Sequence, residues 1–110
     1  MPQFIYRLQP TRPAMLAEGP TEREARIVDE HFDYLKRLTT AGQVLLAGRT
    51  LTADEQAFGI VVFEAECEAA AAGLVAGDPA VRQGVMRAEH WPFRVALWSA
   101  KGPRGEAGGA

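Results

Sequence analysis

Four apolar residues follow one another directly at Ile60–Val61–Val62–Phe63, inside a stretch that predicts a strand from Phe58 to Ala65. Because successive side chains of a strand point to opposite faces of its sheet, this run presents apolar groups to both faces. We therefore expect a strand that is buried on both sides. This requirement limits the fold to one in which both faces of the sheet are covered.

The first part of the chain predicts a strand, a loop and a long helix. Alternation predicts a short strand over Phe4–Leu8, and the prolines and glycine of residues 9–20 indicate a loop. Thr21 and Glu24 fit a capping box, which predicts a helix from Glu22 to Ala41. The apolar residues that we expect on the buried stripe of this helix are Ala25, Val28, Phe32, Leu35 and Leu38.

The remaining elements flank the central strand and follow it. Gln43–Ala47 predicts a strand just before it, and the alanine-rich stretch from Glu66 to Ala76 predicts a second helix. Asp78–Pro79 fits the N-cap and first position of a further helical turn. A long last strand is predicted over Val85–Trp98, where Pro92 implies an edge position or a bulge.

The order of the elements is therefore β-α-β-β-α-β, which predicts an α+β fold. Two split βαβ units with right-handed crossovers give a ferredoxin-like sheet with both helices on one face. We expect residues 1–100 to form this single domain and the glycine-rich residues 101–110 to be a disordered tail. The other sheet face would be apolar and bare, so we expect a homodimer through the open sheet face.

Composition excludes several classes of function. The net charge of −2 provides no basic surface for nucleic acid or for an anionic membrane, and no apolar run is long enough to span a bilayer. Cys67 is the only cysteine, which excludes an internal disulfide and a cysteine-based metal cluster. His31 and His90 lack the spacing of metal ligands. We expect no metal, no organic cofactor and a cytoplasmic location.

His31, in the predicted first helix, and Asp78 are the candidate catalytic residues. A histidine suits proton transfer near neutral pH, and a carboxylate that bonds its ring fixes the tautomer. The alternative is structural: His31 could bond a backbone carbonyl, and Asp78 could serve only as a helix cap. Both functions of Asp78 are compatible, because one carboxylate oxygen can cap while the other orients the imidazole.

Three further residues are candidates for binding a substrate. Arg7 and Arg49 could each hold an anionic group, since a guanidinium can meet a carboxylate at two points. Arg7 lies in an apolar strand and needs a partner there, whereas Arg49 could simply be a solvated turn residue. Tyr34, one turn beyond His31, could offer its phenol to a substrate oxygen or pack with its hydroxyl in water. Tyr6 has the same two interpretations.

The chain resembles the YCII-related family of dimeric α+β barrel proteins from Gln3 to Trp98, nearly its whole length. The residues that carry the resemblance are His31-Phe32-Asp33-Tyr34-Leu35, Ala41-Gly42-Gln43-Val44-Leu45-Leu46-Ala47-Gly48, Gly59-Ile60-Val61-Val62-Phe63, Gly77-Asp78-Pro79-Ala80-Val81 and Gly84-Val85. The family commonly has Gly-Pro after the second strand, where this chain has Arg49-Thr50 behind Gly48. This departure adds a cation near the expected pocket.

The resemblance implies a dimer of ferredoxin-like protomers, with a His–Asp pair in a pocket between helices and sheet. It also implies kinship in fold with muconolactone isomerases and with a dehydrochlorinase of hydroxylated aromatics. We therefore expect a cofactor-free isomerase or lyase in which His31 and Asp78 move a proton of a small anionic or phenolic molecule. The alternative is a non-catalytic dimer that binds a small molecule or regulates another protein.

Overall fold

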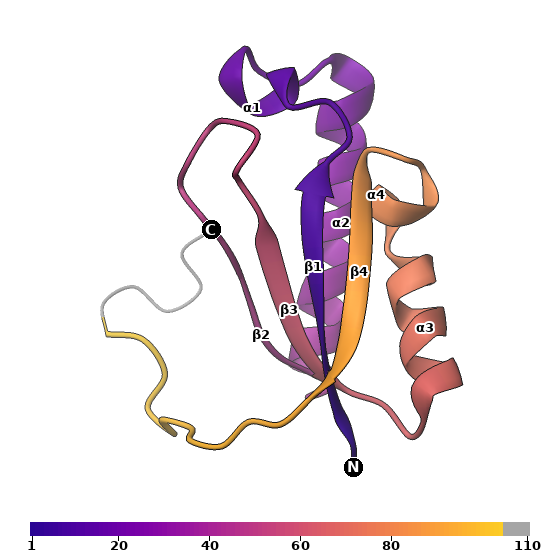
Figure 1. Cartoon of the computed structure of the whole chain (residues 1–110), viewed down its shortest axis with the longest axis vertical. Coiled ribbons are helices and arrows are strands. Elements are labelled where there is room, and N and C mark those ends of the chain that lie inside the picture. The colour runs from indigo at the N-terminus through magenta and orange to yellow at the C-terminus, as the bar shows by residue number, and fades with distance from the viewer. Residues whose placement is uncertain (105–110) are drawn as a thin grey trace.

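The strands assemble into one antiparallel sheet in the order β2-β3-β1-β4, with the helices on one of its faces (Figure 1). The computed structural model describes residues 1–104. Its elements are β1 (Gln3–Pro10), α1 (Ala14–Ala17), α2 (Glu22–Thr40), β2 (Val44–Arg49), β3 (Gly59–Glu64), α3 (Glu68–Gly77), α4 (Pro79–Arg82) and β4 (Met86–Phe93). This arrangement confirms the α+β, ferredoxin-like fold, and the sheet is open rather than closed into a barrel.

The structure differs from the prediction at the last strand. β4 ends at Phe93, so residues 94–98 leave the sheet, and the amide of Val95 donates to Oε1 of Gln3 at 2.6 Å. Pro92 lies in β4, which is an edge strand, as its missing N–H requires. Of the predicted disordered tail, residues 105–110 lie outside the described residues.

The buried face of α2 also differs from the predicted stripe. Phe32 is 49% exposed, whereas Ile27 and Leu35 are buried and His31 lies between them on the same side. The prediction was wrong at Phe32, because the buried face of the helix runs through Ile27, His31 and Leu35 instead. The buried face in the structure includes the polar residue His31, so it is rotated around the helix axis relative to the predicted stripe.

The predicted loop over residues 9–20 contains the short helix α1 and is held against the rest of the domain. Arg12 donates to both carboxylate oxygens of Glu24, at 2.9 and 2.6 Å, and Thr11 bonds the turn before β4. The side chain of Met15 is buried with Ile27 and Ala80. These contacts fix the segment above α2 and α4.

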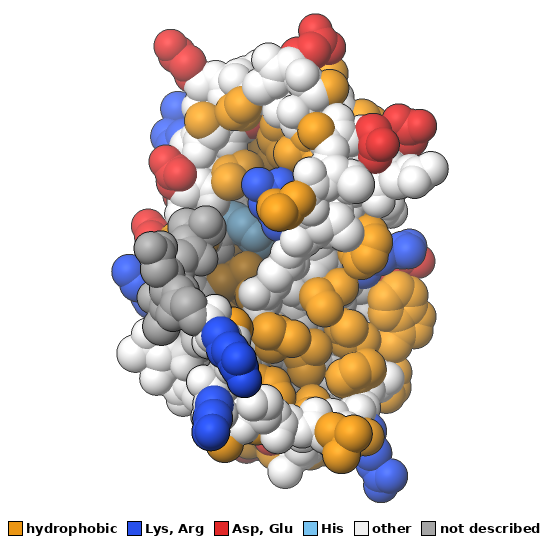
Figure 2. Space-filling view, turned by 90° about the vertical axis from the view of Figure 1, so that its left-hand side faces the viewer, with side chains coloured by type: hydrophobic (Ala, Val, Ile, Leu, Met, Phe, Trp, Pro, Cys, Tyr) orange, Lys and Arg blue, Asp and Glu red, His pale blue; other side chains and the backbone are white. Residues whose placement is uncertain are grey.

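In the described part of the chain, residues 1–104, no helix covers the other face of the sheet (Figure 1). Hydrophobic side chains gather on this face, which lies on the right-hand side of Figure 2. The residues that alternation places there include Ile5, Leu46, Ile60, Val62, Trp91 and Phe93.

Within residues 1–104 no helix is long and apolar enough to cross a membrane.

The capping box of α2 makes part of the stability dependent on pH. Hydrogen bonds from Arg12 and then from the Thr21 backbone lower the pKa of Glu24 from 4.5 to about 2. Since the folded-state pKa lies below the unfolded-state value, the stabilisation is complete above pH 4.5 and is lost as the pH falls towards 2.

We expect Glu24→Gln to lower the Tm at pH 7, because it removes a charge that Arg12 and the helix N-terminus stabilise. The difference in Tm from the wild type should shrink as the pH falls from about 5 to about 2 in circular dichroism melts. Glu22→Gln is the matched control, since Glu22 is an exposed acid in the same turn. A difference that is independent of pH would contradict this account.

Candidate functional site

His31 and Asp78 meet between α2 and the start of α4. Nδ1 of His31 lies 2.7 Å from Oδ1 and 2.8 Å from Oδ2 of the carboxylate. The side chain of Asp78 is 0% exposed and that of His31 is 13% exposed. The pair therefore has its carboxylate in the interior and its imidazole nearer to solvent.

Local sequence explains the placement of Asp78. α3 ends at Gly77, and Asp78 adopts an extended backbone conformation (φ −62°, ψ 122°), as the residue before a proline prefers. Oδ1 of Asp78 accepts from the amide of Ala80 at 2.9 Å, so the residue is the N-cap of α4. The carboxylate thus caps a helix and bonds the imidazole at the same time.

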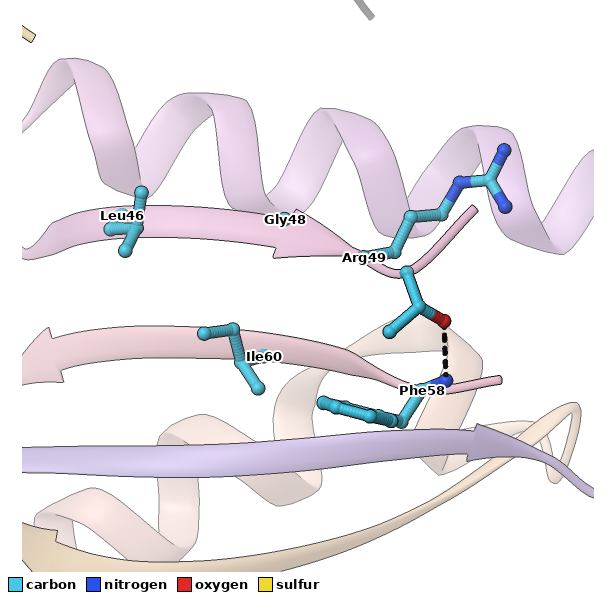
Figure 3. Close-up of a pocket in the computed structure, with 6 residues that line it drawn as sticks. Leu46, Gly48, Arg49, Phe58 and Ile60 are labelled. Atoms are coloured by element: carbon cyan, nitrogen blue, oxygen red, sulfur yellow. Dashed lines mark hydrogen bonds between the residues drawn. The ribbon is translucent and has the colours of Figure 1, made fainter. Parts of the chain in front are cut away.

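Arg49 lies on the same side of the sheet as the pair. It is paired with Gly59, which is paired with Leu8, and Leu8 is buried against the helices. Directly paired residues face the same side, so Arg49 faces the helix layer at the free edge of β2. In Figure 3 its side chain extends away from Phe58 and Ile60. Within residues 1–104 its guanidinium forms no salt bridge.

The pocket drawn in Figure 3 belongs mainly to the opposite, open face. Its volume is about 230 Å³, and its lining residues are Leu46, Gly48, Arg49, Thr50, Phe58 and Ile60. A second hollow of about 380 Å³ shares Leu46 and Ile60 with it and extends under residues 93–98. Neither hollow is lined by His31. On the β2 side of the molecule, Figure 2 shows a histidine side chain recessed in a hollow next to a Lys or Arg side chain.

Arg7, the other predicted anion-binding residue, is on the face opposite to His31. Its neighbour Tyr6 faces the helices, so alternation turns Arg7 to the open face. There Nη2 of Arg7 lies 2.5 Å from Oε1 of Glu89, and the guanidinium lies 5.9 Å from the Trp91 ring centroid. The structure therefore does not bring Arg7 to the His31–Asp78 pair. The partner that its strand position required is Glu89.

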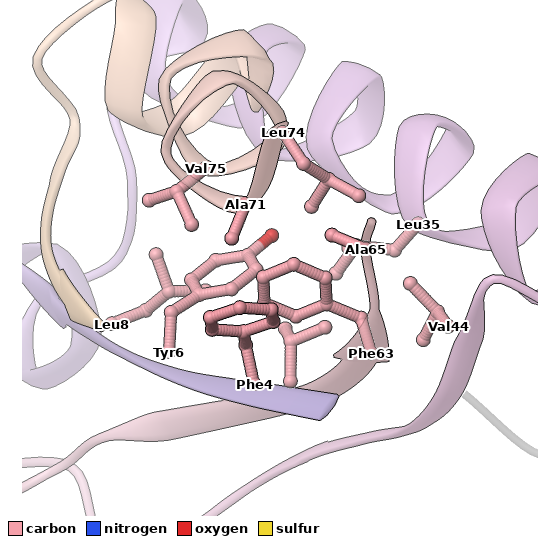
Figure 4. Close-up of a cluster of buried hydrophobic side chains, with 11 residues drawn as sticks. Phe4, Tyr6, Leu8, Leu35, Val44, Phe63, Ala65, Ala71, Leu74 and Val75 are labelled. Carbon is pink, nitrogen blue, oxygen red and sulfur yellow. The ribbon is translucent and has the colours of Figure 1, made fainter. Parts of the chain in front are cut away.

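Tyr6 contacts the pair directly, although the sequence left its function open. Its hydroxyl donates to Oδ2 of Asp78 at 2.9 Å, and the residue is fully buried. In Figure 4 the hydroxyl oxygen points from β1 towards the helices, among Ala71 and Leu74. Burial, and then the charge of Asp78, raise the pKa of Tyr6, so this phenol stays protonated and remains a donor. The available sequence signal was alternation, which places Tyr6 on the same face as Phe4.

Tyr34 holds α3 rather than facing a free space. Its hydroxyl donates to the backbone oxygen of Leu74 at 2.6 Å. A Cβ added at Gly77 would lie 3.1 Å from this hydroxyl, so the close approach depends on glycine. Burial raises the pKa of Tyr34. The contact fixes the end of α3, immediately before Asp78.

The geometry gives His31 a defined chemical capability. An ionised carboxylate only accepts hydrogen bonds, so its contact with Nδ1 requires a proton on that nitrogen. In the neutral ring Nε2 then carries the lone pair, and it makes no hydrogen bond to another group of residues 1–104. A base or acid at Nε2 is what this arrangement can supply. Within the same residues, no group of three or more His, Cys, Asp or Glu could hold a metal ion.

Two substitutions of Asp78 should distinguish its contribution as the N-cap of α4 from that of its hydrogen bonds to Tyr6 and His31. We expect Asp78→Ala to lower the free energy of unfolding by roughly 3–5 kcal/mol, because it removes the cap and leaves Tyr6 and His31 without an acceptor. Asp78→Ser, which keeps a capping oxygen, should recover about 1 kcal/mol of this. Urea unfolding at a fixed protein concentration measures both. Equal stability of Asp78→Ser and the wild type would contradict a contribution from the core contacts.

Comparisons with known proteins assign the chain to a family. The model of the YCII-related domain matches residues 4–94. A comparison with curated proteins finds no match. Among solved structures, the chain is similar to the 5-chloro-2-hydroxyhydroquinone dehydrochlorinase TftG from Burkholderia phenoliruptrix AC1100, in its complex with 2,5-dihydroxybenzoquinone. The TM-score is 0.59 at 18% sequence identity, and the match covers 83% of this chain and 93% of that one. That likeness shows the fold, and the family match over most of the chain shows that it belongs to the YCII-related domain family.

Proposed function

We propose that this protein is a small enzyme of isomerase or lyase type that moves a proton of a small anionic or phenolic molecule without a cofactor. The observation that carries the proposal is the His31–Asp78 contact, with Nδ1 bonded to a fully buried carboxylate and Nε2 without a hydrogen-bond partner among residues 1–104. Asp78 holds the ring and stabilises the imidazolium that forms when Nε2 accepts a proton. His31 is then the proton-transferring residue.

Arg49 supplies the second element of the proposed site. Its charge lies on the helix-facing side of the sheet at the β2 edge, where an ionised oxygen of a substrate would be held. Tyr34 has its hydroxyl committed to Leu74, so we assign it to the support of α3 instead of to the substrate. Arg7 is paired with Glu89 on the other face and is not part of the proposed site.

Two reactions fit a single base beside an anion-binding cation. In an elimination, Nε2 of His31 takes a proton from the substrate while a leaving group such as chloride departs with its bonding electrons. In an isomerisation, the same nitrogen takes a proton from one carbon and returns it to another. The likeness to a dehydrochlorinase with a bound dihydroxybenzoquinone supports hydroxylated, ring-shaped substrates as the first to test.

A test of the proposal follows proton transfer with a panel of probes. We expect chloride release from chlorinated hydroxyhydroquinones, or deuterium incorporation from D₂O into hydroxylated aromatics and lactones, measured by NMR. His31→Gln should lower the rate by about 10² to 10⁴-fold, the usual contribution of a positioned acid or base. Arg49→Gln should raise KM by about 10-fold or more, because it removes a charge-assisted bond.

Arg26→Gln is the control, since Arg26 is an exposed cation elsewhere on α2. Turnover that survives in His31→Gln would refute the function assigned to this residue. Saturable binding of the probes without any proton transfer would instead favour the non-catalytic ligand-binding dimer.

We further propose that the protein is a homodimer whose protomers pack through their open sheet faces. Leu46, Trp91 and Phe93 are 43%, 44% and 42% exposed there, and the two hollows of this face adjoin. An apolar surface of this kind is unfavourable in water, and a second copy would bury it. Such a dimer would cover the face that lacks helices and leave the His31 side of each protomer outside the interface.

Leu46→Asp should convert the dimer to a monomer, because it introduces a charge into the proposed interface. Analytical ultracentrifugation should give twice 11.9 kDa for the wild type and 11.9 kDa for the variant. Phe32→Asp is the matched control, since Phe32 is a similarly exposed apolar residue on α2. A monomeric wild type would contradict the proposal, as would a dimer that Leu46→Asp does not weaken.

A further inference from the structure

The carboxylate of Asp78 accepts hydrogen bonds from three different elements. Nδ1 of His31 approaches from α2, the amide of Ala80 from α4, and the hydroxyl of Tyr6 from β1. Within residues 1–104, Tyr6 is the one side chain of the sheet that bonds this carboxylate. No buried side-chain nitrogen or oxygen in the same part of the chain lacks a hydrogen-bond partner.

The negative charge of the buried Asp78 carboxylate depends on the hydrogen-bond donors around it. Asp78 is fully buried, and burial disfavours the ionised form of a carboxyl group, whereas hydrogen bonds to that form favour it. The amide of Ala80 is a fixed backbone donor, and the imidazole of His31 changes its own charge when it acts. Tyr6 is the remaining donor, and its neutral phenol donates in both states of the histidine.

Tyr6 is too deeply buried to touch a substrate, and its bulk alone does not explain the hydroxyl. Phe4 and Phe63 pack beside it, with ring centroids 5.7 Å apart between Phe63 and each of the other two rings. A phenylalanine would fill the same volume in this aromatic group. The oxygen is what reaches Oδ2 of Asp78, 72 positions away in the sequence.

We propose that Tyr6 is a positioning residue of the site, whose phenol keeps Asp78 ionised and turned towards His31. Oδ2, which Tyr6 bonds, is the same oxygen that lies 2.8 Å from Nδ1 of His31. The phenol thereby takes up part of the negative charge on Oδ2 that would otherwise act on the imidazole. Tyr6 thus makes His31 release its proton more readily. The catalytic meaning of this inference rests on the proposed function, but the effect on His31 does not.

Other ionisable groups on the surrounding elements are the same in the wild type and in Tyr6→Phe. They are Glu30, bonded to Gln83, and Tyr34 on α2, Arg49 on β2, Arg82 on α4, and His90 on β4, bonded to Glu68 of α3. Because none of these groups differs between the two proteins, their influence cancels from that comparison.

The test is an NMR titration of the His31 ring in wild type, Tyr6→Phe and Tyr34→Phe, with His90→Gln to assign the two histidines. We expect Tyr6→Phe to move the midpoint of the His31 titration to higher pH by roughly half a unit to one unit, because Asp78 then holds the imidazolium more strongly. Tyr34→Phe also loses a phenol hydroxyl, but one that bonds Leu74, so its midpoint should match that of the wild type. Asp78→Asn should move it in the opposite direction from Tyr6→Phe.

A second measurement avoids the loss of the hydroxyl. In the Tyr34→Phe background Tyr6 is the only tyrosine, so 3-fluorotyrosine can be incorporated at this one position. The more acidic phenol is a stronger donor and should move the midpoint to lower pH, opposite to Tyr6→Phe. This variant keeps the test decisive if Tyr6→Phe fails to fold.

An unchanged midpoint in folded Tyr6→Phe, or in the fluorinated protein, overturns the proposal. An equal shift in Tyr34→Phe also overturns it, because the effect would then be a general consequence of losing a core hydroxyl. The titration needs no substrate. A shifted midpoint in a protein that transfers no proton would leave the positioning intact and refute the proposed enzyme, whereas turnover with an unchanged midpoint would do the reverse.

Discussion

The structure depends on one buried negative charge. Asp78 has no exposed surface, so its carboxylate must obtain all its hydrogen bonds from the protein. The donors come from β1, α2 and α4, and each of these elements is held in place partly by that bond. The sheet, the long helix and the short helix must therefore be assembled before the charge is stable. The same assembly turns the His31 ring so that Nδ1 faces inward.

Alternation along β1 places the polar groups of neighbouring residues on opposite faces of the sheet. Tyr6 reaches the buried carboxylate, while Arg7, the next residue, pairs with Glu89 on the open face. A shift of one residue in the register of β1 would exchange these two side chains and put a cation against the helices. The register is fixed by pairing on both sides, with β3 and with β4. The central position of β1 thus determines which residues can take part in the site.

Much of the fold could be predicted from sequence because its signals are local. The capping box of Thr21 and Glu24 is present, and the order of strands and main helices follows from periodicity. The buried side of α2 was less accessible, because His31 occupies it and an apolar stripe drawn through Phe32 omits a polar residue. The contacts of Tyr6 and Arg7 could not be read from sequence. They depend on which face each residue of β1 occupies relative to partners more than seventy positions away.

Asp78 is more deeply buried than His31, and this difference limits which molecules can reach the pair. His31 is slightly exposed and Asp78 is not, so a molecule from solvent can meet the imidazole but not the carboxylate. Arg49 lies on the same side of the sheet at the β2 edge, and Gly59 next to it has no side chain to fill the space between Arg49 and Leu8. In the proposed function, a substrate that meets both the imidazole and this cation would approach from the β2 edge. A small anionic molecule is the substrate that we propose for this approach, because Arg49 would hold its charge while Nε2 of His31 takes its proton.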